Sequence, residues 1–406
     1  MSFLRRISTR KLLALCVSVA AFVIGTTVIA MATAGGGPKP APKKLPVAVR
    51  DALTAAPVQG ITARIQFTNH LIDGASVQGA DPLLTGASGR LWASADGHLR
   101  LELQSDTSSN GGVGDVQVLF DRNQATLYDS GANAVYRAKL PAHGSGESAK
   151  RHESPPSVAE IQRSIEDLAK HAGLSGAIPS DVAGRPAYTV RVSPKSAGGM
   201  LGGAQIAWDA VHGTPLRAAV YARGDSSPVL ELKVTDISFG PVSPSVFDVT
   251  PPSGVKVTNL TPPSAEAGPA HRDRGAAPVS GAAAVQKRTS FALAAPKSLA
   301  GLARGEVRLV SSGRHSGALV TYGRGLGTIA VLEAPADGKA GSTAPAPPAN
   351  GEQPGLQLPK VSINGSDGQE LATALGTALM FQRGGVRYVV AGSVPPAAAE
   401  AAARGL

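Results

Sequence analysis

Alternating hydrophobic and polar residues predict that the first half of the chain forms a β-sheet. In residues 60–69 every second residue is apolar, as in a strand with one buried face. Residues 90–95 and 98–104 alternate likewise on either side of Asp96-Gly97, a pair that favours a hairpin turn. Further strand-like runs span residues 116–120, 125–128, 134–140, 187–192, 205–209, 215–222 and 229–239. The residues expected on the inner, apolar side are Ile61, Ala63, Ile65, Phe67, Leu99, Leu101, Leu103, Val116, Val118, Phe120, Tyr188, Val190, Val192, Ile206 and Trp208.

One amphipathic helix is predicted within this series of strands. The segment Ser157-Val-Ala-Glu160 matches a capping box, and Gly173 is expected to end the helix. Four apolar residues recur at intervals of three and four and form one stripe: Val158, Ile161, Ile165 and Leu168. Antiparallel strands joined by short turns predict a mainly β, α+β domain, a curved meander on which this helix packs.

A run of twenty uncharged residues, Leu12 to Met31, lies near the N-terminus. At about 1.5 Å per residue it is long enough to cross a hydrocarbon core of about 30 Å. It exceeds the apolar stretch of roughly 7 to 15 residues in a cleavable signal, which favours a transmembrane anchor. Four basic residues precede it, so we expect a cytoplasmic N-terminus and an extracytoplasmic remainder. Small residues around Ala32 and Ala34 leave export after signal cleavage as the alternative.

Composition divides the chain into segments. Residues 1–34 hold the anchor or signal, and a Gly/Pro/Lys spacer and a first domain follow at residues 35–44 and 45–257. Residues 258–288, rich in Ala, Pro and Gly, are expected to be a linker, and residues 289–406 a smaller α+β domain. In that domain the pattern predicts strands at 305–309, 317–322, 328–332 and 386–392, a loop at 334–358, and a terminal helix at 395–404.

Charge and motif content narrow the classes of function. The net charge is +10, but seven basic and no acidic residues fall in the first 44 positions, so the remainder is nearly balanced. No basic face for nucleic acid is indicated. The single cysteine, Cys16, excludes an intramolecular disulfide. No histidine has a recognised metal-binding spacing, and no nucleophile elbow or phosphate loop is present. We therefore expect no enzyme activity, metal or cofactor.

Four segments carry a resemblance to known proteins of one group. Gly184-Arg-Pro-Ala-Tyr188 before an alternating strand, the strand at Trp208, and the ending Phe247-Asp-Val-Thr-Pro-Pro-Ser-Gly254 are similar to the LolA-like lipoprotein carriers. That group includes the N-terminal domain of the RseB/MucB regulators of anti-sigma factors. The resemblance covers residues 45–257 and implies an incomplete antiparallel barrel with a helical lid and an apolar cavity for acyl chains. The segment from Tyr388 to Ala397 resembles the second domain of RseB-type regulators.

These observations leave three functional hypotheses. The first is a membrane-anchored protein that binds or carries a lipid, or the acyl chains of a lipoprotein, in its half-barrel. The second is an RseB-like regulator or sensor that binds an anti-sigma factor or another membrane protein. The third is a structural envelope protein with a filled core. Alternation alone does not separate them, because apolar residues that pack on one another give the same pattern as a cavity lining.

Overall fold

The computed structural model describes part of the chain, in ranges separated by gaps. The described residues are 37–72, 77–78, 82–105, 115–121, 124–131, 133–139, 157–195, 198–250, 253–260, 279–312, 315–336, 355–356 and 358–406. The predicted anchor or signal at residues 1–34 lies outside them. Across the described ranges, no helix has the length and apolar character needed to cross a membrane.

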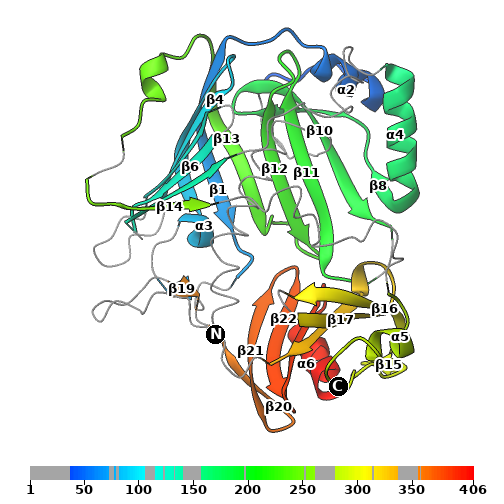
Figure 1. The fold of residues 1–406 in the computed structure, drawn as a ribbon. Helices are drawn as coiled ribbons and strands as arrows, with labels where there is room; N and C mark the ends of the chain where they lie inside the picture. Colours follow the sequence, from blue (N-terminus) through cyan, green and yellow to red (C-terminus); the bar gives the residue numbers. More distant parts are fainter. Residues whose placement is uncertain are drawn as a thin grey trace.

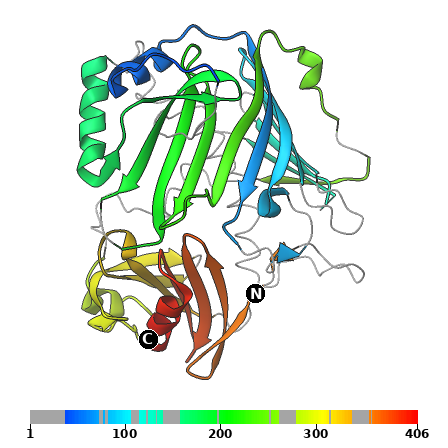
Figure 2. The ribbon, with the colours of Figure 1, turned by 180° about the vertical axis from the view of Figure 1, so that it is seen from behind.

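The first domain is a curled sheet of thirteen strands (Figures 1 and 2). Its order is β14-β7-β6-β5-β4-β3-β1-β13-β12-β11-β10-β8, and β9 also pairs with β10. All described pairs are antiparallel except β14 with β7. The strands are β1 (Gly60–Asn69), β3 (Ala87–Ser94), β4 (His98–Ser105), β5 (Asp115–Asp121), β6 (Gln124–Asp129), β7 (Ala134–Lys139), β8 (Ala172–Leu174), β9 (Ile178–Val182), β10 (Arg185–Pro194), β11 (Leu201–Asp209), β12 (Pro215–Ala222), β13 (Leu230–Phe239) and β14 (Lys256–Leu260).

The predicted half-barrel is thus confirmed as a mainly β architecture. The β3–β4 hairpin turns at Asp96-Gly97, where Gly97 adopts a φ of 92° that favours glycine. Three strands were not predicted: β8, β9 and β14. The last of these extends the sheet to Leu260, three residues into the segment expected to be a linker. Parallel pairing with β7 brings this late segment to the edge of the sheet.

Three helices accompany this sheet, so the expectation of a single helix is wrong. They are α2 (Leu45–Leu53), α3 (Pro82–Thr85) and α4 (Val158–His171). The predicted capping box of α4 is confirmed: the Glu160 amide donates to Ser157 Oγ at 3.3 Å, and Glu160 Oε2 accepts from the Ser157 amide at 2.8 Å. The expectation for Gly173 is wrong, because α4 ends at His171 and Gly173 pairs with Ser193 inside β8.

The second domain is an eight-stranded antiparallel sheet with α6 (Pro396–Arg404) packed on it (Figure 1). Its order is β15-β16-β17-β18-β23-β22-β21-β20. The four predicted strands and the terminal helix are present, whereas β15, β20, β21 and β22 were not predicted. Residues 282–286, expected to belong to a linker, form the short helix α5. The remaining bounds are α5 (Ala282–Gln286), β15 (Ser298–Leu299), β16 (Leu302–Ser312), β17 (His315–Tyr322), β18 (Ile329–Pro335), β20 (Lys360–Ile363), β21 (Ser366–Thr373), β22 (Gly376–Arg383) and β23 (Val386–Gly392).

The two domains are joined by hydrogen bonds. The Ala374 amide donates to the Leu71 carbonyl at 2.8 Å, and the Met200 amide donates to Ser393 Oγ at 2.8 Å. Between the sheets, β2 (Val77–Gln78) pairs with β19 (Gly355–Leu356), a strand inside the predicted 334–358 loop. Gly199 lies so close to the second domain that a Cβ there would be 2.8 Å from the Leu326 carbonyl oxygen.

Candidate functional site

The strand register places the predicted inner residues of β1, β4 and β5 on one face of the sheet, here called the apolar face. Residues that pair directly across strands point to the same side, so each paired row shares a face. One row runs Val118, Leu101, Leu91, Ala63 and Ile237 across five neighbouring strands. Parallel rows hold Phe120, Leu99 and Ile61, then Val116, Leu103 and Ile65. The sequence therefore identified which residues share this face.

The same face continues to the other side of the curled sheet. Phe67 pairs with Leu232, Leu232 with Ala218, Ala218 with Ile206, and Ile206 with Val190. Along β10 and β11, the predicted residues Tyr188, Val192 and Trp208 share the side of Val190 and Ile206 by alternation. All fifteen predicted inner residues consequently belong to one continuous face.

The apolar face is only partly shielded. Ala63, Ile65, Leu103, Val116 and Val118 are buried, with exposures of 3% to 8%. Other members remain partly accessible among the described residues: Ile61, Phe67, Leu99, Leu101, Phe120, Val192, Ile206, Ala218 and Leu232.

The core of the second domain is built around fully buried residues. Its residues Val320, Tyr322, Val331 and Val390 are 0% exposed, and Phe381 is 1% exposed. Partly buried apolar residues such as Phe291, Leu302 and Leu309 pack against this core, as they do in the half-barrel.

The two longer helices cover one end of the apolar face. Leu45, Ala48 and Val49 of α2 and Ile161 of α4 pack in one cluster with Tyr188, Val190 and Trp208. The Tyr188 hydroxyl donates to the Ala41 carbonyl at 2.5 Å, and burial raises the pKa of Tyr188. At another part of the face, Leu83 of α3 packs against the hydrophobic cluster that contains Ala63, Ile65 and Leu103.

The predicted lid stripe divides into two halves. Ile161 is 6% exposed and Ile165 is partly buried against the helix-covered cluster just described. Val158 and Leu168 are 37% and 42% exposed, so neither is shielded by the sheet. The apolar contact of α4 with the sheet is therefore concentrated in the middle of its stripe, while its last turn is tied to Lys195, whose amide donates to the His171 carbonyl.

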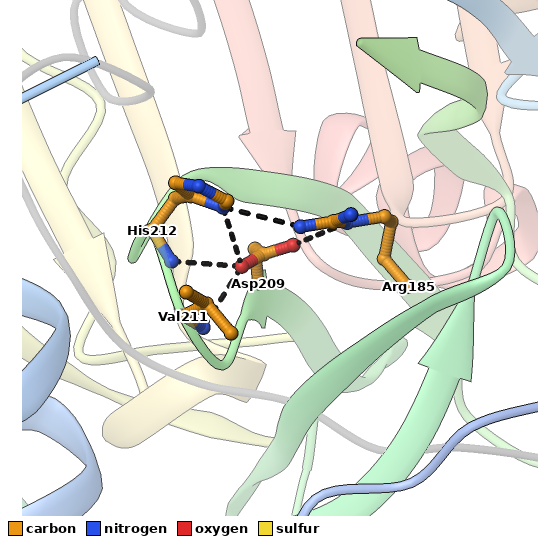
Figure 3. Close-up of polar contacts among 4 residues, drawn as sticks. All are labelled: Arg185, Asp209, Val211 and His212. Carbon is orange, nitrogen blue, oxygen red and sulfur yellow. Dashed lines mark hydrogen bonds and ion pairs between the residues drawn. The ribbon is translucent and has the colours of Figure 1, made fainter. Parts of the chain in front are cut away.

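A polar cluster fixes the turn between β11 and β12 at the α2 end of the sheet (Figure 3). The Asp209 side chain is fully buried and accepts from Arg185 Nε at 2.8 Å and from the Val211 and His212 amides at 2.8 Å each. His212 stacks on Phe239 with a centroid distance of 3.9 Å. Desolvation raises the pKa of Asp209, but these donors outweigh it and leave the pKa below its ordinary value. The cluster acts as a structural clamp because its donors all point at one carboxylate.

The second domain contains a small surface cavity of about 340 Å³. Among its walls are Phe291, Pro335 and Tyr388, with Arg383 and the glycine turn Gly384-Gly385 at the end of the β22–β23 hairpin. The Arg383 guanidinium lies 5.8 Å from the Phe381 ring centroid and 5.9 Å from that of Tyr388. No sequence motif indicates this cavity, because its walls come from three segments that lie more than forty residues apart.

Neighbouring Glu333, on β18 opposite Tyr388, is a fully buried carboxylate. Its Oε2 accepts from the Ala294 amide at 2.8 Å, and its Oε1 has no hydrogen-bond partner among the described residues. Burial raises the pKa of Glu333 to about 7. The carboxyl group therefore titrates near neutral pH inside the second domain.

No family model and no curated protein match the sequence. In structure the chain is similar to a chain of the Pseudomonas aeruginosa MucA/MucB complex, at 14% identity and a TM-score of 0.37, covering 88% of this chain and 95% of that one. It is also similar to MucB in complex with MucA(peri), at 16% identity and a TM-score of 0.36, covering 88% and 94%. A LolA superfamily protein from Nitrosomonas europaea is similar at 8% identity and a TM-score of 0.21, covering 51% and 99%. These neighbours belong to the groups that the sequence resembles, and likeness at these scores assigns no function.

Proposed function

We propose that this chain is a non-enzymatic, membrane-anchored extracytoplasmic protein that holds the acyl chains of a lipid or lipoprotein on the apolar face of its half-barrel. The support is the partial accessibility of that face. Its members Leu101, Phe120, Phe67, Ile206 and Leu232 are apolar yet incompletely covered. A contiguous apolar surface on a folded domain is typical of an interaction site or a ligand-binding groove.

Transfer energy alone supports acyl-chain binding at such a face. Each CH2 group removed from water contributes about 0.8 kcal/mol, so no orienting polar motif is required. The register lines up apolar side chains over the whole width from β5 to β10, which suits a long flexible chain. Access from the α4 side needs α4 to separate from Tyr188, Val190 and Trp208, and Ile161 is its one fully buried contact.

Native mass spectrometry of the full-length protein extracted in mild detergent tests this proposal. We expect bound lipid on the wild type. Leu101→Arg places a charge at a partly accessible position, so the domain folds but loses acyl contacts. Losing contact with two CH2 groups corresponds to more than about tenfold weaker binding.

Gln66→Arg is the matched control, because it adds the same charge on the exposed, opposite side of β1. It should retain the lipid. Ile65→Glu should unfold the domain, since Ile65 is only 3% exposed and an unpaired buried charge is costly. A wild type that carries no lipid, or equal retention by Leu101→Arg and Gln66→Arg, contradicts the proposal.

A regulator that binds an anti-sigma factor or another membrane protein is the second candidate function. The cavity beside Arg383 supports it, because a cationic and aromatic recess on a closed domain suits an acidic or aromatic side chain of a partner. Arg383→Ala should then abolish co-purification of a membrane partner from cross-linked cells while lipid binding persists. Unchanged co-purification would exclude this cavity as the docking site.

A further inference from the structure

Exposed apolar side chains gather at one end of the first domain. The large hydrophobic residues most exposed in the described part of the chain are Val47, Leu53, Val158, Leu168, Val211 and Val257. Val47 and Leu53 lie on α2, and Val158 opens α4, which packs beside α2 (Figure 1). The turn that carries Val211 touches the last turn of α2, because a Cβ on Gly213 would lie 2.3 Å from the Ala52 carbonyl oxygen. Four of the six therefore share this end.

Val211 is presented by a stiff turn. At 62% it is the most exposed large hydrophobic residue described, and its own amide donates to the buried Asp209 carboxylate (Figure 3). Arg185 and the His212 amide hold the same carboxylate. A turn clamped by a buried ion pair cannot fold its tip inward to hide the valine. The exposure of Val211 is therefore built into the fold.

Basic residues lie on α2 and in the segment that leads into it. Lys39, Lys44 and Arg50 are exposed and make no ion pair with any described residue, whereas Lys43 is paired with Asp51 at 2.6 Å. We name Val47, Leu53, Val158 and Val211, together with Lys39, Lys44 and Arg50, the basic-apolar end. Exposed apolar side chains close to unpaired cations on the same helix match an interface of acyl chains beneath anionic head groups.

The chain also enters the domain at this end. Gly37 is the first described residue, and a Cβ there would lie 2.2 Å from Asp181 on β9, next to the hairpin that leads to Arg185. The uncharged run ends at Met31, six residues earlier. Six residues span at most about 20 Å, so a membrane-inserted run holds this end against the bilayer.

We propose that the basic-apolar end docks on the surface of an anionic lipid bilayer. This inference rests on the membrane anchoring in the proposed function, and is independent of whether the half-barrel holds a lipid. Docking inserts Val211 and Leu53 below the head groups while Lys39, Lys44 and Arg50 stay among the phosphates. The end of the apolar face that α2 and α4 cover then lies at the membrane surface.

Site-specific fluorescence quenching tests the docking in the full-length protein. Cys16 is replaced by Ser, and single variants Val211→Cys and Leu53→Cys are labelled with a bimane probe in nanodiscs containing phosphatidylglycerol. Val257→Cys and Leu168→Cys are the matched controls, since both residues are exposed and apolar. Val257 lies on the edge strand β14, and Leu168 lies ten residues, nearly three turns, along α4 from Val158. Nitroxide-bearing lipids should quench the probes at 211 and 53, and leave those at 257 and 168 bright.

Charge reversal gives the second arm of the test. Each basic residue near an anionic surface favours docking by about fivefold, so Lys39→Glu, Lys44→Glu and Arg50→Glu together should lower the docking equilibrium constant by more than about a hundredfold. Quenching at position 211 should then vanish, as it should in nanodiscs of phosphatidylcholine alone. Equal quenching at 211 and 257, or quenching at 211 that survives charge reversal, overturns the docking proposal. Leu101→Arg should leave quenching unchanged, which separates this result from loss of bound lipid.

Discussion

Replacing Ile161 by alanine should release α4 from the sheet. Ile161 is 6% exposed and packs with Tyr188, Val190 and Trp208, so truncation leaves a cavity in the helix-covered cluster. Removal of a buried isoleucine side chain typically costs about 2 to 5 kcal/mol. Since α4 has no other fully buried residue, we expect most of this cost to appear as local opening of the helix.

Val158→Ala is the matched control on the same helix. Val158 is 37% exposed, so its truncation should change stability by less than about 0.5 kcal/mol. Hydrogen–deuterium exchange of the full-length protein measures both variants. Protection across residues 161–171 should fall by about 30-fold or more in Ile161→Ala, which corresponds to about 2 kcal/mol, and remain at the wild-type level in Val158→Ala. Equal loss of protection in both variants, or no loss in either, would refute the assignment of Ile161 as the contact that closes α4.

Three further changes probe other parts of the structure. Glu333→Gln should raise the melting temperature at pH 8 and leave it unchanged at pH 5. The Glu333 carboxyl group has a pKa of about 7 in the folded protein and an ordinary value of 4.5, so between these pH values the folded protein keeps a proton that the unfolded chain releases. The free energy of unfolding of the wild type therefore falls between pH 4.5 and 7, by on the order of 3 kcal/mol. Asp209→Ala should destabilise the first domain by about 2 to 3 kcal/mol in urea titrations at pH 7, because Arg185 and two amides lose their acceptor. In the wild type, the lowered pKa of Asp209 makes the free energy of unfolding decrease as the pH falls below the ordinary carboxyl range. This pH-dependent decrease should be absent in Asp209→Ala. Gly199→Val should speed exchange of the Met200 amide, since the new side chain collides with Leu326 and separates the domains; unchanged exchange would show that this contact is not tight.

The strands of the half-barrel could be predicted from the sequence, because a strand with one buried face places an apolar residue at every second position. The strand expected at 215–222 and the observed β12 have the same bounds, and the paired rows group the predicted inner residues as expected. The capping box at Ser157 likewise located the start of α4, because that motif depends only on local geometry.

The elements that were missed depend on contacts distant in sequence. Helix α2 has no side-chain cap at Lys44 and is held by packing of Leu45, Ala48 and Val49 on β10 and β11, more than 130 residues away. The sequence could not show that β14 pairs with β7, or that Ile161 is buried while Val158 on the same stripe is exposed. An amphipathic stripe indicates the helix face that packs, but the length of the contact depends on the partner surface.

Photo-cross-linking with a diazirine-bearing palmitate in the full-length protein addresses acyl-chain binding on the apolar face most directly. Lipid occupancy of the half-barrel predicts labelled peptides from β1, β4, β5, β11 and β13, centred on Phe67, Leu101, Phe120, Ile206 and Leu232. Labelling should be lost in Leu101→Arg and retained in Gln66→Arg. Labels confined to residues 12–31 or to the second domain, with none on these strands, would contradict acyl-chain binding in the half-barrel.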